Sequence, residues 1–323
     1  MKKNLPVAFR KFFLAILLLN AFQSFAQQDL EKELSNGPRV HEKVSATFKS
    51  TKLINGHTNE TIYKNELDFK VDHRFGDIAG GNGGIRRFFG LDNSTDVRIG
   101  LEYGITDRLS VGLARAKGAT DVQQLYEGSI KYRLLEQTTD DYIPFAVTLF
   151  GSNTIAAVQA SEDATAATAY RNLRDRMNYV SQVMIARKFS PGFSVVLTPS
   201  YVHRNFTAFR DQNDIFAIGA GARAKLTKRM ALVVDYFVPF RNKDDKQYLE
   251  QINGTKFYNP LGVGLEIETG GHVFNLNFTN ATAIQEMQFI PQTTSSWLKG
   301  QYRWGFSISR RFSFNKKDKK QAT

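Results

Sequence analysis

Charged and apolar residues alternate with a period of two from about residue 60 onward. Residues 66–72, Glu-Leu-Asp-Phe-Lys-Val-Asp, place a charge at every even position and an apolar side chain at every odd one. A helix would scatter these charges around its surface, whereas a strand places them on one face and the apolar side chains on the other. Residues 96–103, 261–268 and 274–279 continue the pattern. The alternation therefore predicts an all-β protein.

The same pattern, followed along the chain, predicts twelve strands. Most of them run about 9 to 14 residues, which is longer than the usual five or six residues of soluble sheets. A tilted strand that crosses a membrane needs about 9–11 residues. Length and alternation together predict a transmembrane antiparallel up-and-down β-barrel. The predicted strands are 62–74, 95–105, 109–117, 122–136, 143–154, 177–189, 193–205, 214–226, 230–239, 259–269, 272–280 and 301–314.

The connections between these strands alternate between short and long. The short ones are 105–108, 190–192, 227–229 and 270–271, and the long ones are 75–94, 155–176, 206–213, 240–258 and 281–300. Outer-membrane barrels have short periplasmic turns and longer outer loops. Residues 117–121 form a shorter exception on the expected outer side.

Residues 1–26 have the features of a secretory signal peptide. Four cations (Lys2, Lys3, Arg10 and Lys11) precede a short apolar run over 12–22, and Ser-Phe-Ala ends at Ala26. An uncleaved anchor is the alternative, but a spanning helix needs about 20 apolar residues and this run is shorter. Cleavage after Ala26 takes the net charge from +12 to +8. The sequence predicts an exported protein of the outer membrane.

The segment before the barrel has a parity constraint. Residues 43–55 also alternate and could form a further strand. If 105–108 is a periplasmic turn, the predicted strand 62–74 begins in the periplasm. A strand before it would then have to begin outside the cell, which a periplasmic N-terminus forbids. We therefore assign 27–60 to a periplasmic lead-in or plug-like segment and 61–315 to the barrel. Residues 316–323 form a basic tail, which is typical of a solvated terminus. Basic residues do not interleave with aromatic ones on a continuous surface, so no nucleic-acid partner is expected.

A soluble β-sandwich or a lipocalin-like barrel is the alternative architecture. The charged faces favour the membrane barrel because they are dense and mix both signs, so that these groups can pair across a narrow lumen. Aromatic residues also recur near strand ends, as in the girdles of membrane barrels. The predicted lumen residues, which would line a pore or form salt-bridge ladders, are Glu66, Asp68, Lys70, Asp72, Arg98, Glu102, Glu127, Lys131, Arg133, Arg223, Lys225, Asp235, Glu266, Glu268, Arg303 and Arg311.

Several short motifs are similar to those of a family of Bacteroidota outer-membrane β-barrels of unknown function. They are His-Arg-Phe-Gly at 73–76, Phe-Gly-Leu-Asp at 89–92, Tyr-Gly-Ile-Thr-Asp at 103–107, Lys-Tyr-Arg-Leu-Leu at 131–135 and Ser-Ile-Ser-Arg-Arg-Phe at 307–312. The resemblance covers about 44–314. It implies the location and the fold, and it carries over no catalytic residue.

Signals for chemistry are weak. The chain has no cysteine, which removes disulfides, thiolate metal sites and cysteine nucleophiles. No histidine is followed two residues later by serine, and His203 and Ser200 face opposite sides of one strand. The glycine-rich stretch 80–84 lacks the Lys-Ser/Thr of a phosphate-binding loop, and 211–214 lacks EF-hand spacing. We therefore expect no enzyme, cofactor or metal. Residues 161–177 are expected to hold a short capped helix in the longest loop.

Two functions of different kinds fit this sequence. The first is a narrow channel or small-solute transporter lined by mixed charges, and the second is a non-conducting barrel that serves as a scaffold or binds a partner. An outer-membrane enzyme is a minor third. The expected partners are the outer-membrane lipid bilayer, a small polar solute, and the barrel-assembly machinery, which reads an aromatic end such as Phe312 and Phe314.

Overall fold

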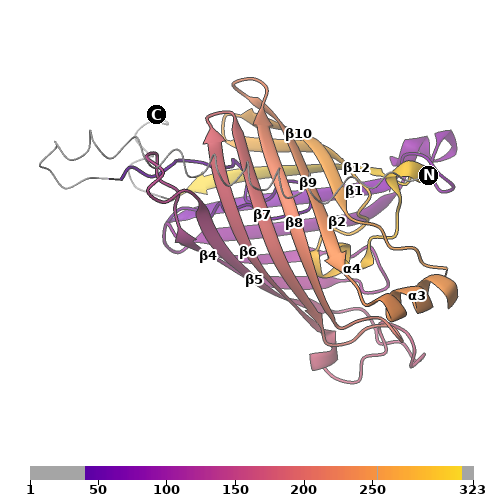
Figure 1. Ribbon diagram of the computed structural model, residues 1–323. Helices are drawn as coiled ribbons and strands as arrows, with labels where there is room; N and C mark the ends of the chain where they lie inside the picture. Colours follow the sequence, from indigo (N-terminus) through magenta and orange to yellow (C-terminus); the bar gives the residue numbers. More distant parts are fainter. Residues whose placement is uncertain (1–40, 253, 315–323) are drawn as a thin grey trace, which may run out of the picture. The chain divides into compact units, whose positions relative to one another are not determined.

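The computed structural model describes residues 41–252 and 254–314, and the chain from Glu42 onward forms one compact unit. Twelve antiparallel strands close into a barrel, in which each strand pairs with the next and β12 pairs with β1 (Figure 1). The strands are β1 (Glu66–Asp77), β2 (Ser94–Gly104), β3 (Leu109–Ala116), β4 (Leu125–Leu135), β5 (Ala146–Ala156), β6 (Met177–Ser190), β7 (Phe193–Arg204), β8 (Asp214–Lys225), β9 (Met230–Phe240), β10 (Leu261–Thr269), β11 (His272–Thr279) and β12 (Arg303–Ser313). All twelve predicted strands are confirmed, with shifts of a few residues at their ends. The predicted signal peptide and the basic tail lie outside the described residues.

Alternation along each strand separates an apolar outer surface from the lumen. Phe69, Leu113 and Ile130 point outward and are 39%, 72% and 50% exposed, whereas Asp68 and Lys70 point inward and are each 4% exposed. Such a surface is unfavourable in water and favourable against acyl chains, and closing the sheet leaves no unpaired strand edge in lipid. Among the described residues, no helix is long and apolar enough to cross a membrane.

The two ends of the barrel differ. At one end, here called the turn end, short turns join β2 to β3, β6 to β7, β8 to β9 and β10 to β11. The longer link 136–145 joins β4 to β5 at the same end. At the other end, the loop end, most links are long, and they carry the helical elements (Figure 1). These elements are η1 (Ile85–Gly90), η2 (Arg174–Arg176), α3 (Lys243–Ile252), α4 (Glu286–Gln292) and η3 (Trp297–Lys299).

The predicted helix over 161–177 is wrong. Within 157–173 the chain forms turns, and only the single turn η2 follows. The Asp163 carboxylate accepts hydrogen bonds from both the backbone N–H and the hydroxyl of Thr165, and Ser161 N donates to Thr168 O at 2.9 Å. These local contacts close a compact loop instead of starting a helix, because short polar side chains compete for the backbone groups. Helices α3 and α4 form in links that were predicted only as polar loops.

The inner face of the barrel is charged on one side and apolar on the other. Ionisable side chains point inward from β1, β2, β4, β10 and β12, as the alternation predicts. The inner faces of β6 to β8 carry buried apolar side chains as well as polar ones, among them Val180, Met184, Val202 and Ile215. On this side a hydrophobic core lies inside the barrel.

Candidate functional site

Residues 47–62, here called the inner segment, lie inside the barrel. They form a hairpin in which Leu53 N donates to Gly56 O at 2.9 Å and Thr58 N donates to Thr51 O at 3.0 Å. The hairpin enters and leaves at the turn end, because Val44 N binds Gln137 O and Lys64 N binds the Asp107 carboxylate. Every residue from 51 to 62 is buried. The inner segment therefore fills the lumen from the turn end inward.

The tip of the hairpin is bound by one buried carboxylate on β9. Three consecutive backbone N–H groups, those of Ile54, Asn55 and Gly56, donate to Asp235 Oδ2 at 3.1, 2.6 and 2.9 Å. The Asn55 amide donates to Asp235 Oδ1 at 2.7 Å. Successive N–H groups of this kind form a concave anion site, and here a carboxylate of the wall occupies it. Asp235 is thus a receptor for the tip.

Two lysines of the wall hold the arms of the hairpin. Lys131 Nζ on β4 donates to the carbonyl oxygens of Thr51, Thr58 and Glu60 at 3.1, 3.5 and 3.2 Å. Lys70 Nζ on β1 donates to Ser50 Oγ at 3.0 Å and to Thr51 Oγ1 at 2.9 Å. Lys131 contacts both arms, so this single ammonium group ties them together.

Further polar contacts join the inner segment to strands around the barrel. They are Arg133 to Glu60 (3.3 Å), Lys49 to Glu268 (3.1 Å), Thr51 Oγ1 to Glu102 (3.4 Å), Thr148 Oγ1 to Asn59 O (2.8 Å) and Asn275 Nδ2 to Leu53 O (3.3 Å). Hydrogen bonds and ion pairs thus hold this segment to the charged side of the wall, whereas Phe48, Leu53 and Ile54 belong to the hydrophobic core inside the barrel.

A second segment, residues 281–296 between β11 and β12, closes the lumen from the loop end and is here called the cap. Its helix α4 is buried from Glu286 to Pro291 and packs on the inner faces of β6, β7 and β9. The Phe289 ring meets Phe237 edge to face at 5.2 Å between ring centroids. Across the mouth, Gln288 Nε2 donates to Thr120 Oγ1 and Val122 O, both at 2.7 Å. Apolar packing therefore anchors the cap on one side and hydrogen bonds anchor it on the other.

The inner segment and the cap meet inside the barrel. Lys52 Nζ lies 2.7 Å from Glu286 Oε1, and His57 Nε2 lies 3.3 Å from the same oxygen. Arg74 of β1 bridges the two segments, because it donates to Asn55 Oδ1 at 2.7 Å and to the carbonyl oxygens of Ala281 and Ala283. The lumen is thus occupied from both ends, and the two occupants contact each other.

The predicted lumen residues share the inward parity of their strands, and the structure divides them into three groups. The first group contacts the inner segment and consists of Lys70, Glu102, Lys131, Arg133, Asp235 and Glu268. The second pairs along the wall: Arg98 with Glu127 (3.0 Å) and Asp72 (3.6 Å), Arg223 with Glu266 (2.7 Å) and Glu268 (2.8 Å), Arg311 with Glu66 (3.7 Å), and Arg303 with Asp77. The third is peripheral: Lys225 is exposed at the turn end, and Asp68 lines a cavity of about 220 Å³ there.

Several residues of this arrangement were not predicted. Arg74 and Asp96 extend the charged alternation of β1 and β2 to the loop end, so the sequence pattern contains a signal for both. Asp96 receives the backbone N–H groups of Gly118 (2.9 Å) and Ile284 (2.8 Å), and so fixes the cap to β2. Glu286 and Lys52 lie in segments for which no strand was predicted, and no feature of the sequence places them in contact.

The structure adds little to the signals for enzymatic chemistry. His203 points outward on β7 and lies 2.7 Å from Asp214 and 2.9 Å from Asn205, whereas Ser200 points inward and accepts a hydrogen bond from Gln182. The two side chains therefore lie on opposite faces of the wall. In residues 41–252 and 254–314, no cluster of three or more histidine or acidic side chains is placed to hold a metal ion.

Solved barrels resemble this chain in their fold. The NanC porin is 10% identical with a TM-score of 0.45, over 76% of this chain and 98% of the porin. The KdgM porin is 8% identical with a TM-score of 0.44, over 77% and 99%. An outer-membrane channel from Pseudomonas putida F1 is 11% identical with a TM-score of 0.47, over 79% and 98%. No curated protein sequence matches this chain.

Family membership rests on the sequence itself. Residues 48–312 match the family model described as a membrane bound beta barrel domain (DUF5777), a range that includes the tip of the inner segment as well as the strands. Together with the apolar outer surface of a closed barrel, this match confirms the predicted location in the outer membrane. The chain belongs to this family of membrane-bound β-barrels.

Proposed function

We propose that this protein is a gated pore of the outer membrane for small polar or charged solutes, and that the inner segment is its gate. The observation that carries this proposal is the way the inner segment is held. Its polar partners on the wall are the charged side chains that an open aqueous lumen would also require, such as Lys131 and Asp235. A wall of this kind can exchange its hydrogen bonds with the segment for hydrogen bonds with water.

The path of the chain supports withdrawal of the inner segment. Both arms of the hairpin leave the barrel at the turn end, beside Gln137 and Asp107. The segment can therefore leave as a loop, without drawing an end of the chain through the wall. The apolar packing of α4 keeps the cap on the β6, β7 and β9 side during this movement. The path that opens would follow the charged side of the lumen.

The released wall charges predict weak ion selectivity. When the inner segment leaves, four cations of the wall (Lys70, Arg74, Lys131 and Arg133) lose their contacts with it, as do three acids of the wall (Glu102, Asp235 and Glu268) and Glu286 of the cap. Because rings of one sign are what select for ions of the opposite sign, a balanced lining favours neither cations nor anions strongly. The proposed solutes are accordingly small and polar, without a fixed sign of charge.

A non-conducting scaffold is the second candidate. The observation that favours it is the complete burial of residues 51–62 together with the apolar anchoring of the cap. A permanently filled barrel would present its outer wall and loops to partners, and its buried ion pairs would serve stability alone.

Conductance in planar bilayers tests the proposal. We expect brief, infrequent openings from the wild-type protein. We expect long openings from a variant in which a short Gly-Ser linker replaces residues 47–61, with a reversal potential near zero across a salt gradient. Heat-modifiable migration in gels checks that each barrel is folded. Absence of conductance from the folded linker variant would contradict the proposed pore and support the scaffold.

A further inference from the structure

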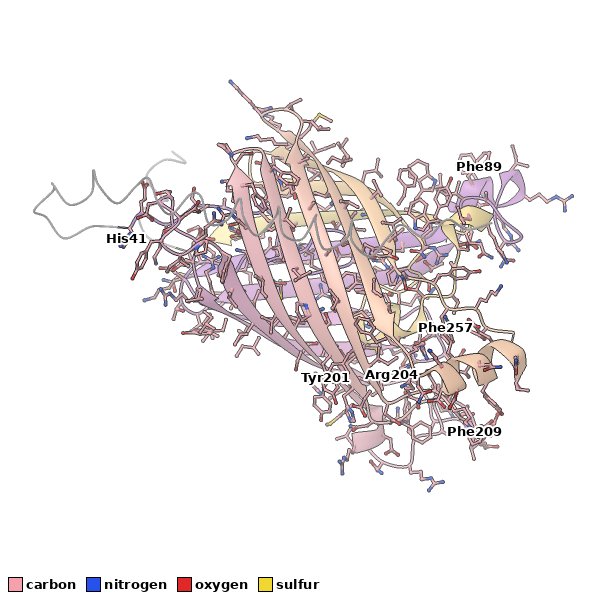
Figure 2. All side chains as sticks on the ribbon, in the orientation of Figure 1. His41, Phe89, Tyr201, Arg204, Phe209 and Phe257 are labelled. Atoms are coloured by element: carbon pink, nitrogen blue, oxygen red, sulfur yellow. The ribbon has the colours of Figure 1, made fainter. Side chains whose placement is uncertain are left out.

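A cavity of about 280 Å³ lies at the loop end, outside the filled lumen. The end of β9, helix α3 and the chain leading to β10 form one side of it, and the cap forms the other through Ile290, Pro291 and Thr293. Figure 2 shows Phe257 between the barrel wall and α3, on the same side of the molecule as Arg204 and Phe209. Ligand pockets commonly measure about 300–1,000 Å³, so this cavity suits a ligand of a single ring.

Arg241 is fixed at the floor of the cavity by three kinds of contact. Its guanidinium lies 2.8 Å from the Asp211 carboxylate, it donates to the carbonyl oxygen of Pro291 in the cap, and its central carbon lies 3.8 Å from the centroid of the Phe257 ring. Asp211 also pairs with Arg204 at 3.0 Å. This network holds the Phe257 ring in place and joins the cavity to the cap.

The charge of the lining is positive. Arg241 shares the single Asp211 carboxylate with Arg204, and Lys246 lies 3.9 Å from Glu250. Lys243 lines the cavity and has no ion pair within the described part of the chain, and no acidic side chain contributes to the lining. An ammonium group without an acidic partner favours an anionic group of a ligand, such as a carboxylate, at this position.

The rest of the lining combines aromatic rings with neutral polar groups. Phe240, Phe257 and Tyr258 contribute flat apolar surfaces, and the Phe240 side chain is 53% exposed. Asn259 lies beside them, and its amide nitrogen donates to the Tyr236 hydroxyl at 2.6 Å. A sugar ring has this combination of an apolar face made of C–H groups and a polar edge made of hydroxyl groups.

We propose that this cavity binds one sugar ring that carries a carboxylate, a hexuronate, with the carboxylate at Lys243 and the ring against the aromatic side chains. The ligand would contact the cap through Ile290, Pro291 and Thr293, so it would bind where the cap joins the barrel wall. Binding does not require the lumen to open, and the site is therefore independent of the proposed gate.

Isothermal titration calorimetry of the full-length protein in detergent tests the site with two ligands, D-glucuronate and D-glucose. They differ only in that glucuronate has a carboxylate where glucose has a hydroxymethyl group. We expect saturable binding of glucuronate and at least about tenfold weaker binding of glucose, which corresponds to about 1.4 kcal/mol. Inorganic phosphate, as a competitor, should displace glucuronate poorly. Absence of saturable glucuronate binding to the folded barrel, or equal affinities for the two sugars, would overturn the proposal. Phosphate binding tighter than glucuronate would also overturn it.

Two variants place the binding in this cavity. Lys243→Gln should weaken glucuronate binding about five- to tenfold, because a charge-assisted hydrogen bond is lost. Lys256→Gln removes a lysine from the same connection that does not line the cavity, so it serves as the matched control and should leave the affinity unchanged. Equal affinities of the two variants would assign the binding to another surface and contradict the proposal.

Discussion

Lys52 of the inner segment and Glu286 of the cap form an ion pair inside the barrel, with 2.7 Å between Nζ and Oε1 and side-chain exposures of 5% and 1%. The two residues are separated by nearly the whole barrel in sequence, and they join the two segments that fill the lumen. A charge buried to this degree is tolerated only when it is paired, because the cost of removing it from water is several kcal/mol. The pair therefore couples the position of the gate to that of the cap.

The first prediction concerns this pair. Lys52→Met should lower the free energy of unfolding by about 3–5 kcal/mol, because Glu286 then remains buried with an uncompensated charge. Lys52→Met combined with Glu286→Met should restore much of this loss, since two apolar side chains of similar volume replace the pair. Urea unfolding of the two single variants and the double variant in lipid vesicles measures the coupling. Additive losses in the double variant would contradict a direct interaction.

The second prediction concerns the receptor for the tip. Asp235→Asn removes the charge that accepts three backbone N–H groups and places an amide against Asn55, so it should cost about 2–3 kcal/mol and loosen the hairpin. The chain has no native cysteine, so a Thr58→Cys probe reports this loosening by its rate of reaction with a polar maleimide. We expect at least about tenfold faster labelling with Asp235→Asn, for a loosening of about 1.4 kcal/mol or more.

Asp68→Asn is the control for this labelling experiment. Asp68 is also a buried acid of the lumen wall, but it lines the cavity at the turn end instead of binding the tip. Labelling of Thr58→Cys should stay slow in that background. Fast labelling in both backgrounds would indicate a general loosening of the barrel and not the loss of one receptor.

The third prediction concerns space at the tip. A Cβ on Gly56 would lie 2.7 Å from Phe237 Cζ, closer than two carbon atoms can approach. Gly56→Val should therefore displace Phe237 from its contact with Phe289 of the cap and cost about 1–3 kcal/mol. Gly81→Val is the control, because a Cβ on Gly81 meets no atom within 4 Å. Equal thermal midpoints for the two variants would contradict the packing described here.

The fourth prediction concerns pH at the loop end. Burial raises the pKa of the Asp211 carboxyl, but the charges of Arg204 and Arg241 outweigh burial and bring its pKa below the ordinary value. A carboxylate with a lowered pKa stabilises the folded state fully above the unfolded value of about 3.9, and this contribution is lost as the pH falls through the folded value. The wild-type protein should thus be more stable than Asp211→Asn at pH 7, and the difference should shrink below about pH 4. A difference that stays constant between pH 7 and pH 3 would contradict the assignment.

Alternation predicted the strands well because one face of each contacts lipid and the other contacts charged groups. In β1, for example, Phe69 faces the lipid and Lys70 faces the lumen, so the alternation of apolar and charged residues has a single interpretation. The same rule predicted Asp235 as a lumen residue but did not predict its role. Its partners are three backbone N–H groups of a segment far away in the sequence, and nothing in the sequence marks those groups as its partners. The alternation is weaker in β6, where the inward side chains mix apolar residues such as Val180 and Met184 with neutral polar ones such as Gln182.

Local sequence patterns could not predict the positions of the inner segment and the cap inside the barrel. Helix α4 is only seven residues long, contains Pro291, and has no solvent-exposed face from Glu286 to Pro291 because these residues are buried. Its helical form depends on packing against the barrel wall. In the inner segment, residues 51–62 pair with one another and with no strand of the wall, and wall side chains such as Lys131 and Asp235 satisfy backbone groups that a sheet would otherwise satisfy. Contacts of this kind join residues far apart in sequence.

A reversible lock on the inner segment tests the central claim most directly. Ile54 Cγ2 lies 2.7 Å from the position of a Cβ on Gly262 of β10, which brings cysteines at both positions within reach of a disulfide, whose Cβ atoms lie about 3.5–4.5 Å apart. Single-channel recording of the Ile54→Cys, Gly262→Cys variant should show no openings when the disulfide is formed. Openings should appear once a reductant is added to the same bilayer. Openings of equal size and frequency before and after reduction would contradict the claim that the inner segment closes the lumen.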